Sequence, residues 1–450
     1  MKILVINGSP KGKYSVTLQT IRYLQIKFPE HSFGVINAAQ KIKHLEKDLS
    51  PVLDRIAQAD LIIFSYPIYT FLAPSQLHKL IRRIKESGAD LSGKFVTQLT
   101  TSKHFYDMTA HRYILENCQD MRMKVIHGLS ADMDDLLSEK GQKEAENFFR
   151  YVCWSVDHNQ YEPFPTPLLP AASQAPSLPE NSKENKDGDV VIVADLREED
   201  HQLLAMIHRF QAVCPHKTRL VNLREFPFQG GCLGCMQCGA SGKCVYKDGF
   251  EDFLRRDIQS AQATVYAFSI QDHSMGPLFK CYDDRQFCNG HRTVTMGRPV
   301  GYLVSGPYSR EQNLKTVIEA RAQVGGNFLA GVATDEVNPD DAIDRMAARL
   351  SYSLEHHYAP PSNFYGVGGM KIFRDLIWLM QGFMKADHKF YKEHGQYDFP
   401  QKKLGTMLAM YLVGGLMHSP AMKGKGAKQM RDGMLAPYQK ILAKAQKEKK

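Results

Sequence analysis

The fold is decided by the stretch that opens the chain, Lys2-Ile3-Leu4-Val5-Ile6-Asn7-Gly8-Ser9-Pro10. Its apolar run is continuous rather than alternating, which is typical of a strand buried on both faces, as in a parallel sheet. Apolar residues then recur at helical spacing over Val16–Phe28. A buried strand followed at once by an amphipathic helix predicts a parallel sheet that is covered by helices.

The alternation of strand and helix continues after this unit. We predict strands at Leu61–Ser65, Phe95–Thr100 and Lys124–Gly128, and helices at Ser75–Glu86, Ala110–Gln119 and Ser138–Trp154. Residues 1–158 are therefore predicted to form a doubly wound α/β domain. The stretch from Glu162 to Asp189 holds six prolines, and we assign residues 159–188 to a Pro-rich linker.

The pattern restarts after this linker and predicts a second doubly wound domain over residues 189–358. Its strands are expected at Val190–Ala194, Arg219–Leu223, Thr264–Phe268, Val300–Ser305 and Phe328–Ala333, with helices at Asp200–Val213, Phe250–Ser260, Tyr308–Gly325 and Pro339–His356. The two halves resemble each other: Ile56–Leu61 is similar to Ile258–Ala263, and Pro74–Lys79 is similar to Met275–Lys280. We therefore predict two copies of one α/β fold in tandem.

Residues 359–450 are predicted to be a helical extension that ends in a basic tail, with helices at Met370–Lys389 and Leu404–Met417. The chain carries 57 Lys and Arg against 48 Asp and Glu, a net charge of +9. Residues 422–450 contain nine of the basic residues and only two acidic ones, Asp432 and Glu448. The rest of the chain is therefore nearly neutral. This placement does not favour a nucleic-acid partner, which needs a basic folded face. A solvated tail and weak peripheral contact with an anionic membrane stay open.

Compartment can be predicted from the N-terminus and from the cysteines. The chain begins directly with a strand, so we expect no signal peptide, and no apolar run reaches the roughly 20 residues of a spanning helix. Four of the nine cysteines fall within 13 residues, Cys232 to Cys244. Without a secretory signal, such clustering indicates metal or redox chemistry rather than a disulfide framework. We expect a cytoplasmic protein.

Three loops are expected at the carboxyl edge of the first sheet. Gly8–Thr17 is rich in Gly, Ser and Thr and precedes a helix N-terminus, which predicts a phosphate site. The loops Ser65–Phe71 and Thr100–Tyr106 emerge at the same edge and supply aromatic faces and polar backbone for a flat heterocycle. A Ser/Thr capping loop without a ligand is the alternative for the first loop.

With these motifs, the first domain resembles the flavodoxin-like NADPH-dependent FMN reductases. That family carries Gly-Ser-Pro-Arg…Ser/Asn-x-Thr and then Pro-x-Tyr, which here read Gly8-Ser9-Pro10-Lys11…Ser15-Val16-Thr17 and Pro67-Ile68-Tyr69. Lys11 replaces the usual Arg, which keeps the charge and loses the bidentate fork. The resemblance implies that FMN is held through its phosphate by Ser9, Lys11, Ser15 and Thr17, beside its ring by Pro67, Ile68, Tyr69 and Phe71, and on a third side by Thr101 and Ser102.

The second domain carries Cys232-x-x-Cys235-x-x-Cys238 and then Cys244. Successive CxxC spacing is typical of ligands to a [4Fe–4S] cluster, whereas tetrahedral zinc favours two separated CxxC pairs. Zinc and metal-free redox thiols stay open as alternatives. Within the family, the spacing resembles the iron-sulfur flavoproteins, which implies Cys232, Cys235, Cys238 and Cys244 as ligands of a [4Fe–4S] cluster.

The two copies differ in opposite places. The first loop of domain 2, Ala194–Asp200, carries four carboxylates that would repel a phosphate. We predict that Phe268-Ser269-Ile270 of domain 2 corresponds to the Pro-x-Tyr motif of domain 1. We therefore expect FMN on domain 1 and the cluster on domain 2.

The resemblance implies an FMN-dependent oxidoreductase that passes electrons from a reduced donor, NAD(P)H or ferredoxin, to an unidentified acceptor. The chemistry is expected at the flavin N5, since no separate acid–base pair or nucleophile stands out. The alternatives are an electron carrier without turnover and an interaction protein that has lost its cofactors. A homo-oligomer is compatible with the sequence.

Overall fold

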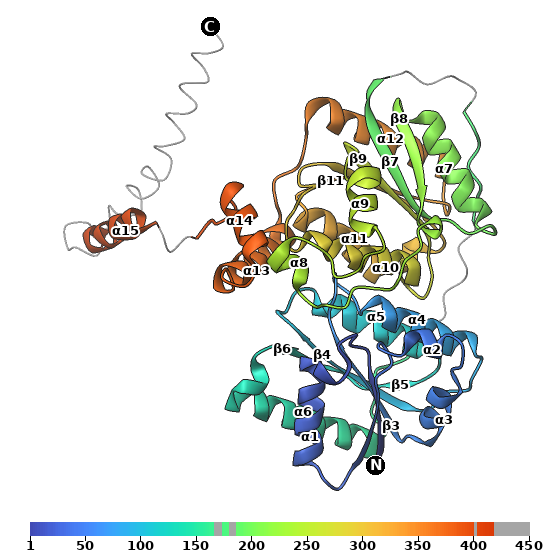
Figure 1. Ribbon diagram of the computed structural model, residues 1–450, viewed down its shortest axis with the longest axis vertical. Helices are drawn as coiled ribbons and strands as arrows, with labels where there is room; N and C mark the ends of the chain where they lie inside the picture. The colour runs from blue at the N-terminus through green and yellow to red at the C-terminus, as the bar shows by residue number, and fades with distance from the viewer. Residues whose placement is uncertain (166–172, 180–185, 400–402, 418–450) are drawn as a thin grey trace. The chain divides into compact units, whose positions relative to one another are not determined.

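The computed structural model describes residues 1–165, 173–179, 186–399 and 403–417 (Figure 1). Parts of the predicted linker, residues 166–172 and 180–185, lie outside the described residues, as does the basic tail from residue 418 onward. One compact unit, Met1–Tyr391, contains both sheets. Helix α15 (Leu404–Met417) belongs to the remainder of the chain.

The first sheet is parallel throughout and has the order β2-β1-β3-β4-β5, with β6 paired to β4. Its strands are β1 (Lys2–Asn7), β2 (Ser32–Ile36), β3 (Leu61–Pro67), β4 (Phe95–Ser102), β5 (Lys124–Val125) and β6 (Leu129–Asp132). The helices are α1 (Val16–Lys27), α2 (Ile42–Leu45), α3 (Ser50–Gln58), α4 (Ser75–Glu86), α5 (Asp107–Asp120) and α6 (Glu139–Asp157). This order is that of a doubly wound, flavodoxin-like sheet.

The second sheet repeats the same order, since β8-β7-β9-β10-β11 corresponds to β2-β1-β3-β4-β5. Its strands are β7 (Lys186–Asp195), β8 (His216–Asn222), β9 (Ala263–Ser269), β10 (Pro299–Ser305) and β11 (Phe328–Thr334). The main helices are α7 (His201–Val213), α10 (Pro277–Arg285), α11 (Gln312–Val324) and α12 (Pro339–His356). Two shorter helices are α8 (Gln237–Ser241) and α9 (Phe250–Phe253). Helix α9 continues as a π-helix over Leu254–Ile258. The predicted fold class, two parallel-sheet copies in tandem, is confirmed.

Each sheet buries both faces, as the continuous apolar strands predict. In β1, Ile3 and Val5 pack under α1 and α6, while Leu4 and Ile6 join a second core on the other face. That second core is continuous from one sheet to the other through α4 and α10, where Leu77 and Phe279 belong to it. Figure 1 shows α4, α5, α10 and α11 lying between the two sheets. The two copies therefore share one hydrophobic core, which explains why they form one compact unit.

Some elements differ from the prediction. Strand β2 and helix α3 were not predicted, because Ser32–Ile36 is short and carries a glycine at its centre. The strand expected at Lys124–Gly128 ends at Val125, and the chain resumes pairing with β4 only at Leu129. Such errors at element boundaries follow from short apolar runs that carry little periodic signal.

Two helices of the C-terminal extension, α13 (Phe364–Leu379) and α14 (Lys385–Glu393), follow α12. α13 packs closely on the second domain, since a Cβ added at Gly369 would lie 2.5 Å from Val324 Cγ2 and 3.0 Å from Phe105. Helix α13 therefore joins both domains, because Phe105 lies after β4 in the first. In the part of the chain that the structure describes, no helix is both long and apolar enough to cross a membrane.

Candidate functional site

The loop after β1 is shaped by Asn7, which ends the strand. Its side-chain amide donates to the carbonyl oxygen of Gly12 (3.0 Å), and its Oδ1 accepts from the backbone N–H of Ser9 (3.1 Å). The hydroxyl of Ser15 caps α1 by accepting from Leu18 N–H at 3.4 Å. The loop therefore turns back over the sheet edge and leaves the positive end of the α1 dipole beside its hydroxyl groups.

The loop after β3 turns through Thr70 and Phe71, which both have positive φ (45° and 70°). Tyr69 and Leu72 close the turn, since each backbone N–H donates to the carbonyl of the other (2.9 and 3.1 Å). Two consecutive left-handed residues without glycine cost of order 1–3 kcal/mol each and persist only where the surroundings hold them. Here domain 2 does so, because Lys280 Nζ donates to the carbonyl oxygen of Tyr69 at 2.8 Å.

The loop after β4 is tied to the first loop. The hydroxyl oxygens of Thr17 and Thr101 lie 2.6 Å apart in a hydrogen bond, and both side chains are buried. The hydroxyl of Ser102 accepts from the backbone N–H of His104 at 2.8 Å. The three loops predicted to converge thus meet at one edge of the sheet.

One predicted residue lies elsewhere. Phe71 does not line the cavity that these loops form; it is buried against Phe105 and Tyr106, with ring centroids 5.0 and 4.6 Å away. The positive φ of Phe71 turns its side chain toward the domain interface, where the guanidinium of Arg321 lies 6.0 Å from the ring. Phe71 therefore lies at the interface between the two domains, outside the lining of the cavity.

The cysteine motif lies on a loop that is held on both sides. Arg285 of α10 pairs with both carboxylate oxygens of Asp248 (2.8 and 2.9 Å) and donates to the carbonyl of Gly230 at 2.9 Å. From domain 1, Gln76 Nε2 donates to the carbonyl of Cys232 at 3.2 Å. Gly234 has a φ of +61°, and a Cβ there would lie 1.8 Å from the Tyr69 hydroxyl oxygen. The cysteine loop therefore touches the aromatic loop of domain 1.

The four thiols differ in their environment. Burial raises the pKa of Cys232, and it raises the pKa of Cys238 to about 11. The sulfur of Cys232 accepts a hydrogen bond from the backbone N–H of Gly234 at 3.4 Å. Among the described residues, no three of these thiols have their sulfurs within 4.8 Å of one another. The four thiols are thus spread around the cavity that they line rather than gathered at one point.

The three loops of domain 1 and the cysteine loop line one cavity of about 320 Å³. Nine of the ten residues predicted for a flavin contribute to its wall: Ser9, Lys11, Ser15, Thr17, Pro67, Ile68, Tyr69, Thr101 and Ser102. So do all four predicted cysteine ligands, Cys232, Cys235, Cys238 and Cys244. Two sets of residues that lie at least 130 positions apart in the sequence thus face the same space.

Sequence reasoning missed one wall of this cavity. Ile372, Phe373, Leu376 and Met380, from α13 and its end, line it together with His291. Nδ1 of His291 lies 3.0 Å from a carboxylate oxygen of the buried Asp387, in α14. The apolar spacing of α13 was visible in the sequence, but nothing there indicates which cavity a C-terminal helix covers.

In the corresponding first loop of domain 2, the acidic side chains form ion pairs with neighbouring arginines. Asp195 is buried and pairs with Arg224 at 2.8 Å, and both carboxylate oxygens of Asp200 accept from Arg197. Burial raises the pKa of Asp195, while the hydrogen bonds from Arg197 outweigh burial and hold the pKa of Asp200 below its usual value. Because acids and their partner arginines fill this loop, it offers a phosphate no free cation.

The turns of the two copies can be matched directly. Gln271 and Ser274 close a turn through Asp272 and His273, which have positive φ (52° and 59°) like Thr70 and Phe71. Gln271 therefore corresponds to Tyr69, and the counterpart of Pro-x-Tyr is Ser269-Ile270-Gln271. The sequence comparison placed it one residue too early, because no motif remains there to fix the register.

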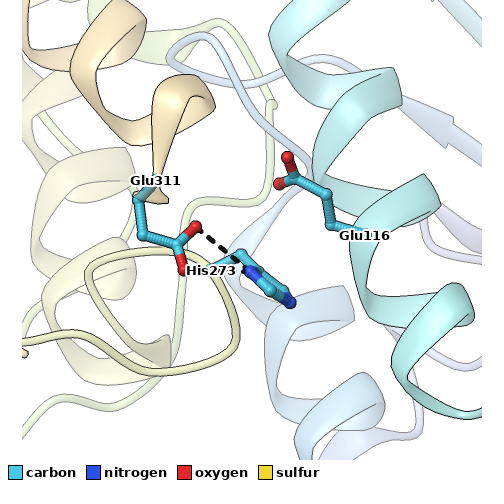
Figure 2. Close-up of side chains that lie close together, drawn as sticks. All are labelled: Glu116, His273 and Glu311. Atoms are coloured by element: carbon cyan, nitrogen blue, oxygen red, sulfur yellow. Dashed lines mark hydrogen bonds and ion pairs between the residues drawn. The ribbon is translucent and has the colours of Figure 1, made fainter. Parts of the chain in front are cut away.

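His273 lies between Glu116 of α5 and Glu311, which immediately precedes α11 (Figure 2). Its Nδ1 is 3.1 Å from both oxygens of Glu311, and its Nε2 is 3.0 Å from Asp120. Burial lowers the pKa of His273, but the hydrogen bonds to Asp120 and Glu311 outweigh it and raise the pKa to about 10. Both ring nitrogens are engaged, so His273 joins the domains as an imidazolium and offers no lone pair to a metal ion.

Comparison with known proteins adds to this geometry. Residues 1–132 match the model of the family described as NADPH-dependent FMN reductase. The iron-sulfur flavoprotein of Archaeoglobus fulgidus is 25% identical over 177 residues, covering 36% of this chain and 78% of that protein. The FMN-dependent NADH:quinone oxidoreductase of Azospirillum brasilense is 28% identical over 116 residues, covering 20% of this chain and 56% of that protein.

Among solved structures, the flavoenzyme NAD(P)H:(acceptor) oxidoreductase of Paracoccus denitrificans is 17% identical with a TM-score of 0.29, and the match covers 35% of this chain and 95% of that one. The family match spans the first sheet together with all three loops of the cavity that domain 1 supplies. Residues 1–132 of this chain are therefore similar to the family of NADPH-dependent FMN reductases.

Proposed function

We propose that this flavin-dependent oxidoreductase holds FMN and a [4Fe–4S] cluster in one cavity and passes electrons between them. The observation that carries the proposal is that the loop Ser9–Thr17 and the motif Cys232–Cys244 line the same space of about 320 Å³. Electrons would pass directly between two redox groups that share one cavity, without a long-range path through the protein. The tandem arrangement would then supply both sites from a single chain.

The residues of domain 1 fit the phosphate of FMN. Hydroxyl groups of Ser9, Ser15 and Thr17 line the cavity beside the N-terminus of α1, whose 12 residues give it a full dipole. Lys11 adds a cation that has no ion-pair partner in the described part of the chain. Pro67, Ile68 and Tyr69 would flank the ring, and Thr101 and Ser102 would line its third side. When bound, FMN supplies hydride and single-electron chemistry.

The residues of domain 2 fit a thiolate-bound cluster. Cys232, Cys235, Cys238 and Cys244 all reach the cavity, and the N–H of Gly234 donates to the Cys232 sulfur, as is common around iron–sulfur sites. Because burial raises the pKa of Cys238 to about 11, metal binding would release its proton. Arg285 holds the loop by its pair with Asp248.

The proposal includes a donor, an acceptor and a compartment. NAD(P)H is the donor that the family implies, and ferredoxin is the alternative for a chain with a cluster. The wall formed by Ile372, Phe373 and Leu376 favours an apolar acceptor, because burial of apolar surface is what such a wall can offer. Clustered free thiols suit a reducing compartment, so a cytoplasmic location forms part of the proposal.

Steady-state oxidation of NADPH and NADH by the FMN-loaded full chain tests the activity. Saturable turnover with a quinone or ferricyanide is expected, and Lys11→Gln should reduce it by weakening FMN binding. Flavin bands without saturable turnover would indicate an electron carrier. A chain that binds no FMN at all would leave only an interaction role and would contradict the proposal.

A further inference from the structure

Helix α15 (Leu404–Met417) contains no charged residue. The side chains described along it are exposed, among them Leu408 (64% exposed), Tyr411 (79%), Leu404, Met407, Met410 and Leu412. The remaining residues of the helix are also uncharged, and Thr406 and the hydroxyl of Tyr411 are its polar side-chain groups, so no charged face is left for water. A helix that is apolar all round is stable only in a protein core or in lipid.

The length of α15 decides between lying in a membrane and crossing one. Fourteen residues of helix extend about 21 Å, which is less than the roughly 30 Å of a bilayer core. A short apolar helix of this length suits the boundary between headgroups and acyl chains.

Charge in the flanking sequence indicates the kind of surface. Lys402 and Lys403 stand immediately before the helix, and Lys423, Lys425, Lys428 and Arg431 follow it in the sequence. Residues 422–450 carry a net charge of +7. Each such basic residue contributes about 1 kcal/mol of electrostatic binding free energy near an anionic leaflet, and a neutral leaflet offers no comparable attraction. An apolar insertion element beside a basic segment supplies the two signals that stable peripheral binding needs.

Helix α13 of the compact unit shows a second apolar surface, independently of α15. Phe364 and Leu379 are 86% and 81% exposed, and Val367 is also exposed, while Ile372 and Leu376 line the cavity. One helix therefore forms a wall of the cavity and also presents large apolar side chains to the outside.

We propose that the chain binds the surface of a membrane rich in anionic lipid, with α15 inserted at the interface and Lys403, which precedes it, at the headgroups. The apolar side chains of α15 are thus proposed to contact a lipid bilayer rather than a second copy of the chain. This inference does not rest on the redox function, and its test needs no cofactor.

Co-sedimentation of the full chain with lipid vesicles tests the proposal. Vesicles of phosphatidylcholine mixed with phosphatidylglycerol should carry the protein down, while vesicles of phosphatidylcholine alone should carry down much less. Leu408→Asp should lower the affinity for the mixed vesicles by about tenfold or more, because a carboxylate is costly at that depth. The exposed residue Leu137, which lies in domain 1, provides the matched control, and Leu137→Asp should bind like the unaltered chain.

Insertion can be followed directly with Tyr411→Trp, whose emission should shift to shorter wavelength when mixed vesicles are added. Absence of sedimentation with mixed vesicles would overturn the proposal. Equal binding of the unaltered chain and Leu408→Asp would also overturn it, because binding would then need only the basic tail. Loss of a dimer in Leu408→Asp, measured by light scattering without any vesicle binding, would assign the helix to a second copy instead.

Discussion

The ammonium group of Lys280, in the second domain, donates a hydrogen bond to the backbone carbonyl of Tyr69, in the first, at 2.8 Å. Lys280 is fully buried and also pairs with Asp284, whose carboxylate accepts from the backbone N–H of Ser75 at 2.8 Å. Burial raises the pKa of Asp284, and the positive charge of Lys280 beside it acts in the opposite direction. The second copy of the fold therefore holds the strained aromatic loop of the first copy in place.

Lys280→Met should weaken both the fold and flavin binding. It leaves Asp284 buried without its cation, a loss of about 3–5 kcal/mol, and it removes the donor to Tyr69. Thermal unfolding and FMN titration measure the two effects. Lys79→Met is the control, because Lys79 pairs with Glu46 at the surface and should cost less than about 1 kcal/mol. Equal losses in both variants would contradict the role given to Lys280.

The imidazolium of His273 should make domain pairing depend on pH. Its pKa in the folded chain is about 10, above the ordinary value of 6.5, so its stabilisation is complete below about pH 6.5 and is lost as the pH rises toward 10. His273→Gln should therefore destabilise the chain by about 2 kcal/mol near pH 6 and by much less near pH 10. Denaturant unfolding at both pH values measures the difference. A difference that does not change with pH would show that His273 is neutral.

Lys11→Gln should weaken FMN binding by about tenfold, or about 1.4 kcal/mol, because a cation in the phosphate loop is lost. The effect should shrink at high salt, since the interaction is between charges. Lys13→Gln is a matched control, because Lys13 is exposed and does not line the cavity. Equal FMN affinities of the two variants would place the phosphate elsewhere.

Leu376→Ala should affect an apolar acceptor more than a small charged one. The side chain forms part of the α13 wall, and its loss removes about 2 kcal/mol or more of apolar contact from the cavity. The KM for a hydrophobic quinone should rise severalfold, and the KM for ferricyanide should change less. Val367→Ala changes an exposed residue of the same helix and serves as the control. An equal change for both acceptors would mean that neither contacts this wall.

Much of the fold could be predicted because both halves are built from buried parallel strands. The run Ile3–Ile6 and the helix Ser75–Glu86 give strong periodic signals, and they lie where predicted. The three loops of domain 1 could also be predicted to converge, because the carboxyl ends of parallel strands meet at one edge. Their order along the sheet follows from the topology alone.

The cavity as a whole could not be predicted, because it depends on how the two copies pack. Nothing in the spacing of Cys232 and Cys235 indicates that they face Tyr69, since the buried pair of Lys280 and Asp284 brings these loops together. The wall from α13 depends in the same way on a close approach at Gly369. The position of Phe71 outside the cavity could not be predicted, because a positive φ is not visible in its sequence context.

The central claim is that one chain holds both redox groups in a single cavity, and the cofactor content of the anaerobically prepared full chain tests it most directly. FMN and iron should be present together, at about one FMN and about four iron atoms per chain. Lys11→Gln should lower the FMN content and spare the iron, and Cys235→Ser should do the reverse. A folded chain that takes up neither FMN nor iron under these conditions would contradict the account.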